Sequence, residues 1–298
     1  GLLVSIELPV RHAYLLELVG NKQELPNAIA ITSLMANCGR LLGPALAGFV
    51  ISAWSEAACF VINAITFVVV IVTFLMMRVT ASVHRAAPAA MWQGMREGLA
   101  YAWQSVPIRL LLALLVIMGL LASPYMSLMP ALVRSVFQGN AEQMGLFVGA
   151  SGLGGVVGTL YLAARPSVRG LLGVLAAASF AAGTALALLA WSGTVWVALP
   201  LLTVIGFGML VASVSVNMIL QTIVDDDKRG RIMSLYTAAF LGMSPFGSLA
   251  AGTIADAVGI VATLTTCGMG CAAAALYIAY KRPQLREHVR PIYARVGV

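Results

Sequence analysis

The longest uncharged stretch of the chain decides its fold class. Residues 170–224 read GLLGVLAAASFAAGTALALLAWSGTVWVALPLLTVIGFGMLVASVSVNMILQTIV, which is 55 residues without Asp, Glu, Lys or Arg. A helix of about 20 residues crosses the ~30 Å hydrocarbon core of a bilayer, so this stretch is long enough for two crossings. It divides at Trp191-Ser-Gly-Thr-Val-Trp196, where the two tryptophans are typical of an interfacial aromatic belt. We therefore expect two membrane-spanning helices here.

The composition of the whole chain agrees with this expectation. Of 298 residues, 60% are hydrophobic and 10% are charged, and the mean hydropathy is +0.94. Soluble domains carry about 25% charged residues, so a soluble enzyme and a disordered chain are both excluded. Seven further stretches are long and apolar enough to span a membrane: 1–19, 28–52, 57–77, 110–133, 143–164, 232–255 and 257–280. The sequence predicts an all-α polytopic membrane protein with nine visible transmembrane helices.

The basic residues predict which way the spans point. When the loops are numbered alternately, 15 of the 18 Lys and Arg residues fall on one side and Arg134 alone falls on the other. An excess of Lys and Arg marks cytoplasmic loops, so the first side, which includes the C-terminus, is predicted to be cytoplasmic. The net charge of +7 lies in short clusters between apolar runs. A nucleic-acid partner is not expected, because that requires the charge to gather on one soluble face.

An internal repeat predicts two halves. Residues 28–48 align without gaps on residues 232–252, which places Gly43 on Gly247 and Gly48 on Gly252. The first visible span then corresponds to the seventh, a period of six helices, and repeats of this kind build transporters. We expect about three N-terminal helices to be absent from this sequence. The predicted parts are the last three helices of a first lobe (1–77), a cytoplasmic linker (78–109), a six-helix second lobe (110–280) and a basic cytoplasmic tail (281–298).

The linker contains apolar residues at three- and four-residue steps. These are Trp92, Met95, Leu99 and Trp103, with Arg96 and Glu97 on the opposite face. The spacing predicts an amphipathic helix on the cytoplasmic membrane surface. The alternative is a flexible linker that happens to contain tryptophans.

Charged residues within spans are functional candidates, because each costs roughly 2.5–3.5 kcal/mol on insertion scales. Glu7 is twelve residues from Val19, and Arg40 is twelve residues from Ala28. At about 1.5 Å per residue both lie ~18 Å deep, close to the midplane and within reach of each other. In one interpretation Glu7 exchanges a proton or a cationic group of the cargo, while Arg40 holds its charge state or an anionic group of the cargo. In the other the two form a fixed, neutralising salt bridge.

Three further polar positions are open to two interpretations each. Arg11 lies shallower than Glu7, so it either joins the coupling site or extends its side chain to the interface. Asn217 and Gln221 share a helix face near the end of a span, where they either line a cavity or bond across helices. The repeat counterparts of Glu7 and Arg40 are Val211 and Ser244, so the charge pair is not a requirement of both halves.

Small residues on one helix predict close helix packing. Gly39, Gly43, Pro44 and Gly48 form Gly-x3-Gly-Pro-x3-Gly, in which glycines allow close approach and proline bends the helix. Gly247 and Gly252 are the second-half counterparts of this pattern.

Catalytic and metal-binding patterns are not found in the sequence. Cys38, Cys59, Cys267 and Cys271 lie in apolar runs, His12, His84 and His288 are scattered, and there is no Gly-Lys-Ser/Thr phosphate loop. We expect no enzyme activity, no metal and no cofactor.

Three stretches resemble the transmembrane secretion effectors, a bacterial branch of the major facilitator superfamily that includes enterobactin-exporter-like proteins. The first joins Arg11-His-Ala-Tyr-Leu-Leu-Glu-Leu-Val19, Leu25-Pro-Asn-Ala28 and Arg40-Leu-Leu-Gly-Pro-Ala-Leu-Ala-Gly48. The second is Gly94-Met-Arg-Glu-Gly-Leu-Ala-Tyr101. The third joins Arg229-Gly-Arg-Ile-Met-Ser-Leu-Tyr236 with Pro245-Phe-Gly-Ser-Leu-Ala-Ala-Gly-Thr-Ile-Ala-Asp256.

The resemblance implies a two-lobe bundle of twelve helices in a bacterial plasma (inner) membrane. It implies alternating access driven by a proton or another ion, with export of a small amphipathic molecule such as a drug-like compound or a siderophore. Gly39, Gly43, Pro44 and Gly48 match the family's antiporter motif, with Ala47 where a second glycine is usual. The alternatives are a non-transporting sensor or partner protein, an inactive truncated remnant, or import instead of export.

The first prediction concerns the buried carboxylate. We expect Glu7→Gln in the full-length protein to abolish pH-driven transport, because it removes the titrating site. Flux would be measured in proteoliposomes across a pH gradient. Unchanged flux with unchanged pH dependence would reject the coupling role.

Overall fold

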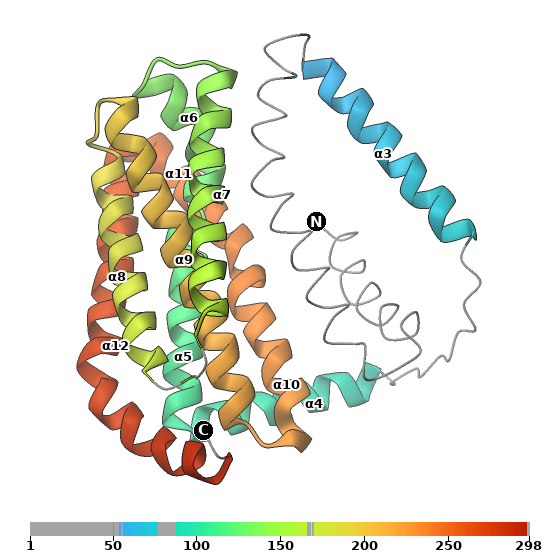
Figure 1. Ribbon diagram of the computed structural model, residues 1–298, viewed down its shortest axis with the longest axis vertical. Coiled ribbons are helices and arrows are strands. Elements are labelled where there is room, and N and C mark those ends of the chain that lie inside the picture. Colours follow the sequence, from blue (N-terminus) through green and yellow to red (C-terminus); the bar gives the residue numbers. More distant parts are fainter. Residues whose placement is uncertain are drawn as a thin grey trace. The chain divides into compact units, whose positions relative to one another are not determined.

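The computed structural model describes residues 56–76, 88–165 and 170–296, together with the single residues 50, 54 and 168. The chain divides into two units, residues 1–85 and 86–298. In the first unit the described helix is α3 (Glu56–Met76), close to the predicted span 57–77 (Figure 1). The predicted spans 1–19 and, apart from residue 50, 28–52 lie outside the described residues, and so do Glu7, Arg11, Arg40, Gly39, Gly43, Pro44 and Gly48.

The second unit is a bundle of long antiparallel helices (Figure 1). Six helical stretches are long and apolar enough to cross a membrane: Val106–Ser135, Ala141–Ala163, Leu171–Leu189, Val195–Ile223, Lys228–Val258 and Ile260–Glu287. Each overlaps one of the six spans that the sequence predicts between 110 and 280. All elements of the described residues are helices, so the all-α class holds there.

Four of the six spans are single helices. They are α7 (Ala141–Ala163), α8 (Leu171–Leu189), α9 (Val195–Ile223) and α12 (Ile260–Val296). Local sequence sets their ends: the Asn140 side chain accepts the Gln143 backbone N–H at 3.1 Å and starts α7. Between α11 and α12, Gly259 has φ +88°, a backbone conformation that favours glycine.

The other two spans are interrupted by short π-helical segments. One consists of α5 (Val106–Ile117), η1 (Met118–Ala122) and α6 (Tyr125–Ser135). The other consists of α10 (Asp226–Thr237), η2 (Ala238–Gly242) and α11 (Met243–Val258). The segments η1 and η2 contact each other, and a Cβ at Gly119 would lie 2.9 Å from the Phe240 carbonyl oxygen. Wide turns of this kind are frequent at functional sites.

Glycine allows the helix backbones to approach closely, as membrane helices require. A Cβ at Gly154 on α7 would overlap the Thr203 carbonyl of α9, and a Cβ at Gly206 on α9 would overlap the Ser151 carbonyl of α7. Gly247 and Gly252, the second-half counterparts of Gly43 and Gly48, differ in how closely other helices approach them. A Cβ at Gly247 would overlap the Leu120 carbonyl, whereas one at Gly252 would meet no atom of the described chain within 4 Å.

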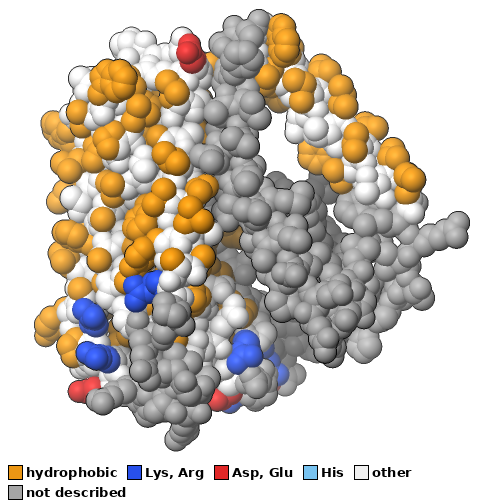
Figure 2. Space-filling model, in the orientation of Figure 1, with side chains coloured by type: hydrophobic (Ala, Val, Ile, Leu, Met, Phe, Trp, Pro, Cys, Tyr) orange, Lys and Arg blue, Asp and Glu red, His pale blue; other side chains and the backbone are white. Residues whose placement is uncertain are grey.

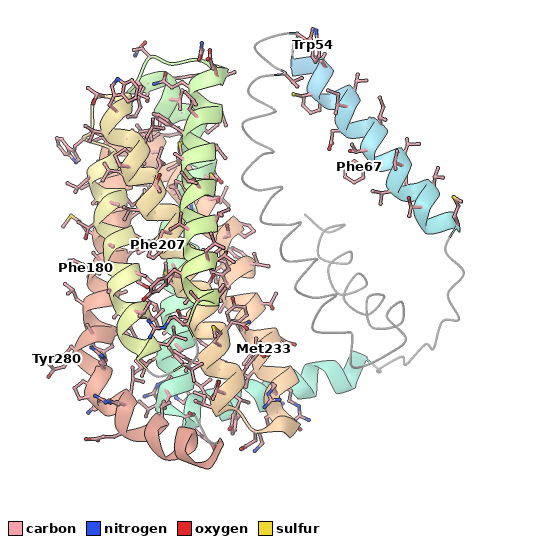
Figure 3. All side chains as sticks on the ribbon, in the orientation of Figure 1. Trp54, Phe67, Phe180, Phe207, Met233 and Tyr280 are labelled. Carbon is pink, nitrogen blue, oxygen red and sulfur yellow. The ribbon has the colours of Figure 1, made fainter. Side chains whose placement is uncertain are left out.

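Residues that face away from these contacts are large and apolar. Figure 3 shows Phe180 and Tyr280 projecting outward from α8 and α12, while Phe207 points toward α7. The rings of Phe207 and Tyr161 are 5.9 Å apart. Trp191, in the turn between α8 and α9, and Trp196, in the first turn of α9, are 70% and 84% exposed.

Helix α12 extends beyond the span into the predicted tail. It continues to Val296, so residues 281–296 are helical, and Leu285 and Val289 are buried. The helix curves at its C-terminal end in Figure 1. Pro283, which cannot donate a backbone N–H, favours a bend in this part of the helix.

The glycine contacts between α7 and α9 give a matched test. We expect Gly154→Ala to destabilise the protein by about 1–3 kcal/mol through overpacking, seen as a lower thermal unfolding midpoint in detergent. Gly155→Ala is the control, since its Cβ would lie 3.8 Å from Leu210 Cδ1, an ordinary contact. Equal effects of the two variants would contradict this account of the packing.

Candidate functional site

Polar residues recur every four positions along α9. Ser213, Asn217 and Gln221 lie on one face of the helix, and Asp225 follows just after the helix ends at Ile223. Ser213 is ten residues before Ile223, which places it about 15 Å inside the span. Exposure rises along this row, from buried Ser213 and half-buried Asn217 to exposed Gln221 and Asp225. The row therefore leads from the interior of the span to one end of the bundle.

Hydrogen bonds connect this row to α10. The Gln221 Nε2 donates to Asn217 Oδ1 at 2.6 Å. The Tyr236 hydroxyl donates to the Ser213 carbonyl oxygen at 3.1 Å and also hydrogen-bonds the Asn217 side chain. We call Ser213, Asn217, Gln221 and Tyr236 the polar cluster.

The chemistry of the polar cluster suits an uncharged or amphipathic ligand. An Asn or Gln amide offers two donors and an acceptor oxygen, and Gln221 is exposed. Polar groups within an apolar bundle are costly unless they are paired. This pairing allows the cluster to stay within the span while still presenting hydrogen-bonding groups.

Charged residues gather at the end of the bundle to which the row leads. Figure 2 shows Lys and Arg side chains concentrated there, and we call this the basic end. It includes Arg96, Arg109, Arg165, Lys228, Arg229, Arg231, Lys281 and Arg282.

The linker helix α4 (Pro88–Gln104) lies at the basic end. The Glu97 carboxylate is 2.6 Å from the Arg231 guanidinium of α10, and the Tyr101 hydroxyl donates to Asp225 Oδ2 at 3.2 Å. Leu99 and Trp103, predicted for the apolar face, are 55% and 67% exposed. The face of α4 that packs on the bundle is therefore not the face that carries Leu99 and Trp103.

Serine pairs join the two interrupted spans. The hydroxyls of Ser123 and Ser244 are 2.5 Å apart, and those of Ser127 and Ser248 are 2.9 Å apart. Ser244, the repeat counterpart of Arg40, contacts Ser123 in the turn between η1 and α6. Val211, the counterpart of Glu7, faces α7, where its Cγ2 would lie 3.1 Å from a Cβ at Gly158. The two counterparts contact different segments of the chain, so the repeat does not itself pair Glu7 with Arg40.

Metal and thiol chemistry finds no support in the described part of the chain. No group of three or more His, Cys, Asp or Glu side chains there could hold a metal ion. Cys267 and Cys271 are free and buried, and Cys59 is half-buried.

Six helices of the described residues that are long and apolar enough to cross a bilayer define the class of multi-pass membrane proteins. The family comparison makes this specific. The model of the transmembrane secretion effector family matches residues 1–291, and the chain belongs to this family of major facilitator transporters.

Similar proteins are transporters by name. The chain is 25% identical to the staphyloferrin A transporter of Staphylococcus aureus, over 96% of this chain and 72% of that protein. It is 24% identical to the multidrug efflux pump Tap of Mycolicibacterium fortuitum, over 88% of this chain and 64% of the pump. It is 25% identical to the MFS-type transporter YfiS of Bacillus subtilis, over 89% of this chain and 65% of YfiS. The chain thus spans about two thirds of the length of these relatives.

Sequence reasoning singled out two of the four cluster residues. Asn217 and Gln221 were visible because of their i, i+4 spacing, and the same spacing extended backward would have added Ser213. Tyr236 was not identifiable as a member, because its contact with Asn217 depends on how α10 packs against α9.

The polar cluster is expected to add little to stability. We predict that Tyr236→Phe and Asn217→Leu each lower the free energy of unfolding by about 0.5–1.5 kcal/mol, with a coupling near 0.6 kcal/mol, since interhelical bonds in membranes average about that value. A double-mutant cycle of unfolding in detergent measures both quantities.

Ser215→Ala is the control for this cycle. Its hydroxyl is buried on the same helix, without a partner in the described structure, so its removal should be neutral or stabilising. A coupling above about 3 kcal/mol between Tyr236 and Asn217 would make the cluster a structural anchor instead.

Proposed function

We propose that this protein is a secondary active transporter that exports a small amphipathic molecule, a drug-like compound or a siderophore, by alternating access. The observation that carries the proposal is the polar cluster, which offers amide and hydroxyl groups within a span and becomes more exposed toward the basic end. The family and the transporter relatives support the same conclusion.

The coupling ion is proposed to be the proton. Moving one charge through the membrane potential supplies about 2.3 kcal/mol per 100 mV, so one titrating site suffices. Glu7 is the proposed carboxylate, with Arg40 controlling its charge state and Arg11 nearer the interface. The four side chains of the polar cluster are uncharged, so they suit contact with cargo better than proton exchange.

The membrane orientation follows from the charge distribution. The basic end collects Lys and Arg residues from the linker and from the ends of several spans, and the positive-inside rule assigns such an end to the cytoplasm. We therefore place the protein in a bacterial inner membrane with its C-terminus in the cytoplasm. In this orientation the polar cluster lies on the cytoplasmic half of α9, where cargo for export would enter.

The cluster variants test this function in the full-length protein. We expect Asn217→Leu with Gln221→Leu to raise the KM for ethidium in proteoliposomes about 5- to 150-fold, since two hydrogen bonds of roughly 0.5–1.5 kcal/mol each are lost. The maximal rate should change much less.

Thr222→Val is the matched control beside Gln221. The Thr222 hydroxyl donates to the Met218 carbonyl of its own helix at 2.8 Å, so its loss should leave the KM unchanged. Equal KM values for the cluster variant and the unmodified protein would contradict a cargo-binding role.

A further inference from the structure

We infer that Glu97, Tyr101 and Arg231 are positioning residues: the linker helix α4, docked on α10, holds Tyr236 in the polar cluster. This inference rests on the proposed function for the consequence in transport, while its structural core, the dependence of Tyr236 on α4, can be measured without cargo.

The docking contact has an electrostatic part. The Glu97 carboxylate and the Arg231 guanidinium approach to 2.6 Å, and each side chain is close to half exposed, at 45% and 44%. One turn further along α4, the Tyr101 hydroxyl donates to Asp225, and the Lys228 ammonium lies 4.6 Å from the centre of the Tyr101 ring. The same face of α4 therefore meets the first turns of α10 at two successive points.

The docking contact also has a steric part. A Cβ at Gly98 would lie 3.1 Å from Arg231 Cβ and 3.6 Å from Leu235 Cδ1. Ala102, one turn away, is 3% exposed. Small residues at i and i+4 thus let the two helices approach closely, in the manner expected of tight helix crossings.

The position of α10 determines the position of Tyr236. Arg231, Leu235 and Tyr236 lie on the same twelve-residue helix, Asp226–Thr237. The π-helical segment η2 begins directly afterward, at Ala238. Because the helix ladder changes there, α10 is a short regular unit between a turn and a π-segment. Helix α4 contacts this unit from its first turn, at Lys228, as far as Leu235.

Each interaction between α4 and α10 contributes only a small free energy, so the contact can be weakened stepwise. Exposed ion pairs contribute about 0.2–1 kcal/mol, so loss of one pair should displace Tyr236 partly and leave the fold intact. The exposed residues Leu99 and Trp103 on the other face of α4 take no part in this contact.

The first experiment measures Tyr236 without cargo. In full-length protein with Cys38, Cys59, Cys267 and Cys271 replaced by Ala, Tyr236→Cys is labelled with a water-soluble maleimide. We expect Glu97→Gln to speed labelling about two- to fivefold, and Gly98→Leu, which forces the helices apart, to speed it about tenfold or more. The charge swap Glu97→Arg with Arg231→Glu should restore the original rate.

Ala100→Leu is the matched control, because it adds the same side chain to an exposed position of α4 two residues away. It should leave labelling unchanged. The inference would be overturned if Glu97→Gln and Gly98→Leu left the labelling rate unchanged, as Ala100→Leu should. It would also be overturned if all three variants raised the labelling rate equally.

The second experiment connects positioning to transport, with Tyr236 intact. We expect Glu97→Gln to raise the KM for ethidium about two- to fivefold with the maximal rate within twofold, and the charge swap to restore it. A purely structural role would lower the amount of folded protein and the maximal rate instead, with no rescue by the swap, and would overturn the inference.

The outcomes separate this inference from the proposed function. If the α4 variants change Tyr236 labelling while Asn217→Leu and the α4 variants all leave the KM unchanged, positioning is supported and cargo binding by the cluster fails. If Asn217→Leu raises the KM but the α4 variants change neither quantity, cargo binding is supported and positioning by α4 fails.

Discussion

The structure depends on one constraint, the absence of water in the hydrocarbon core of the bilayer. Backbone polar groups must then be satisfied within helices, and the helices associate by close packing, since lipid tails compete for apolar side chains. The described helices meet this constraint with glycine at their crossings, as between α7 and α9 at Gly154 and Gly206. Large apolar side chains such as Phe180 and Tyr280 are left on the outer surface.

The same constraint makes the polar cluster informative. A hydroxyl or amide in this environment is costly unless it is paired, and Tyr236, Asn217 and Gln221 are paired with one another or with backbone. Their small expected contribution to stability leaves the cluster available for another role. Its exposure increases toward the basic end, which connects the interior of the span with the surface at which α4 docks.

Much of the fold could be predicted from the sequence, because span length is a local property. The 55 uncharged residues of 170–224 predicted two spans, and the structure has α8 and α9 with a turn that contains Trp191 between Leu189 and Val195. The interruptions η1 and η2 were not predicted, since both lie in apolar runs with no residue that requires them. The continuation of α12 through the tail was also not predicted, because burial of Leu285 and Val289 depends on tertiary packing.

The site was less predictable, because most of its members come together only through tertiary packing. The i, i+4 pair Asn217 and Gln221 is visible on one helix, whereas Tyr236 and the Glu97–Arg231 ion pair join segments far apart in the chain. The pattern in α4 predicted a membrane-facing side that includes Leu99 and Trp103, and the structure leaves both exposed. The pattern did not single out Gly98, which lies against α10. Small residues carry little weight in a hydrophobic pattern, although they determine how closely helices approach.

Cargo-dependent proton movement tests the central claim most directly. Full-length protein in proteoliposomes would be loaded with a pH-sensitive dye and exposed to ethidium or staphyloferrin A, with liposomes lacking protein as the control. The account predicts a proton flux that begins on addition of cargo and is lost in Glu7→Gln. Cargo movement without proton flux would contradict coupling, and the absence of both for each cargo would contradict transport of these classes.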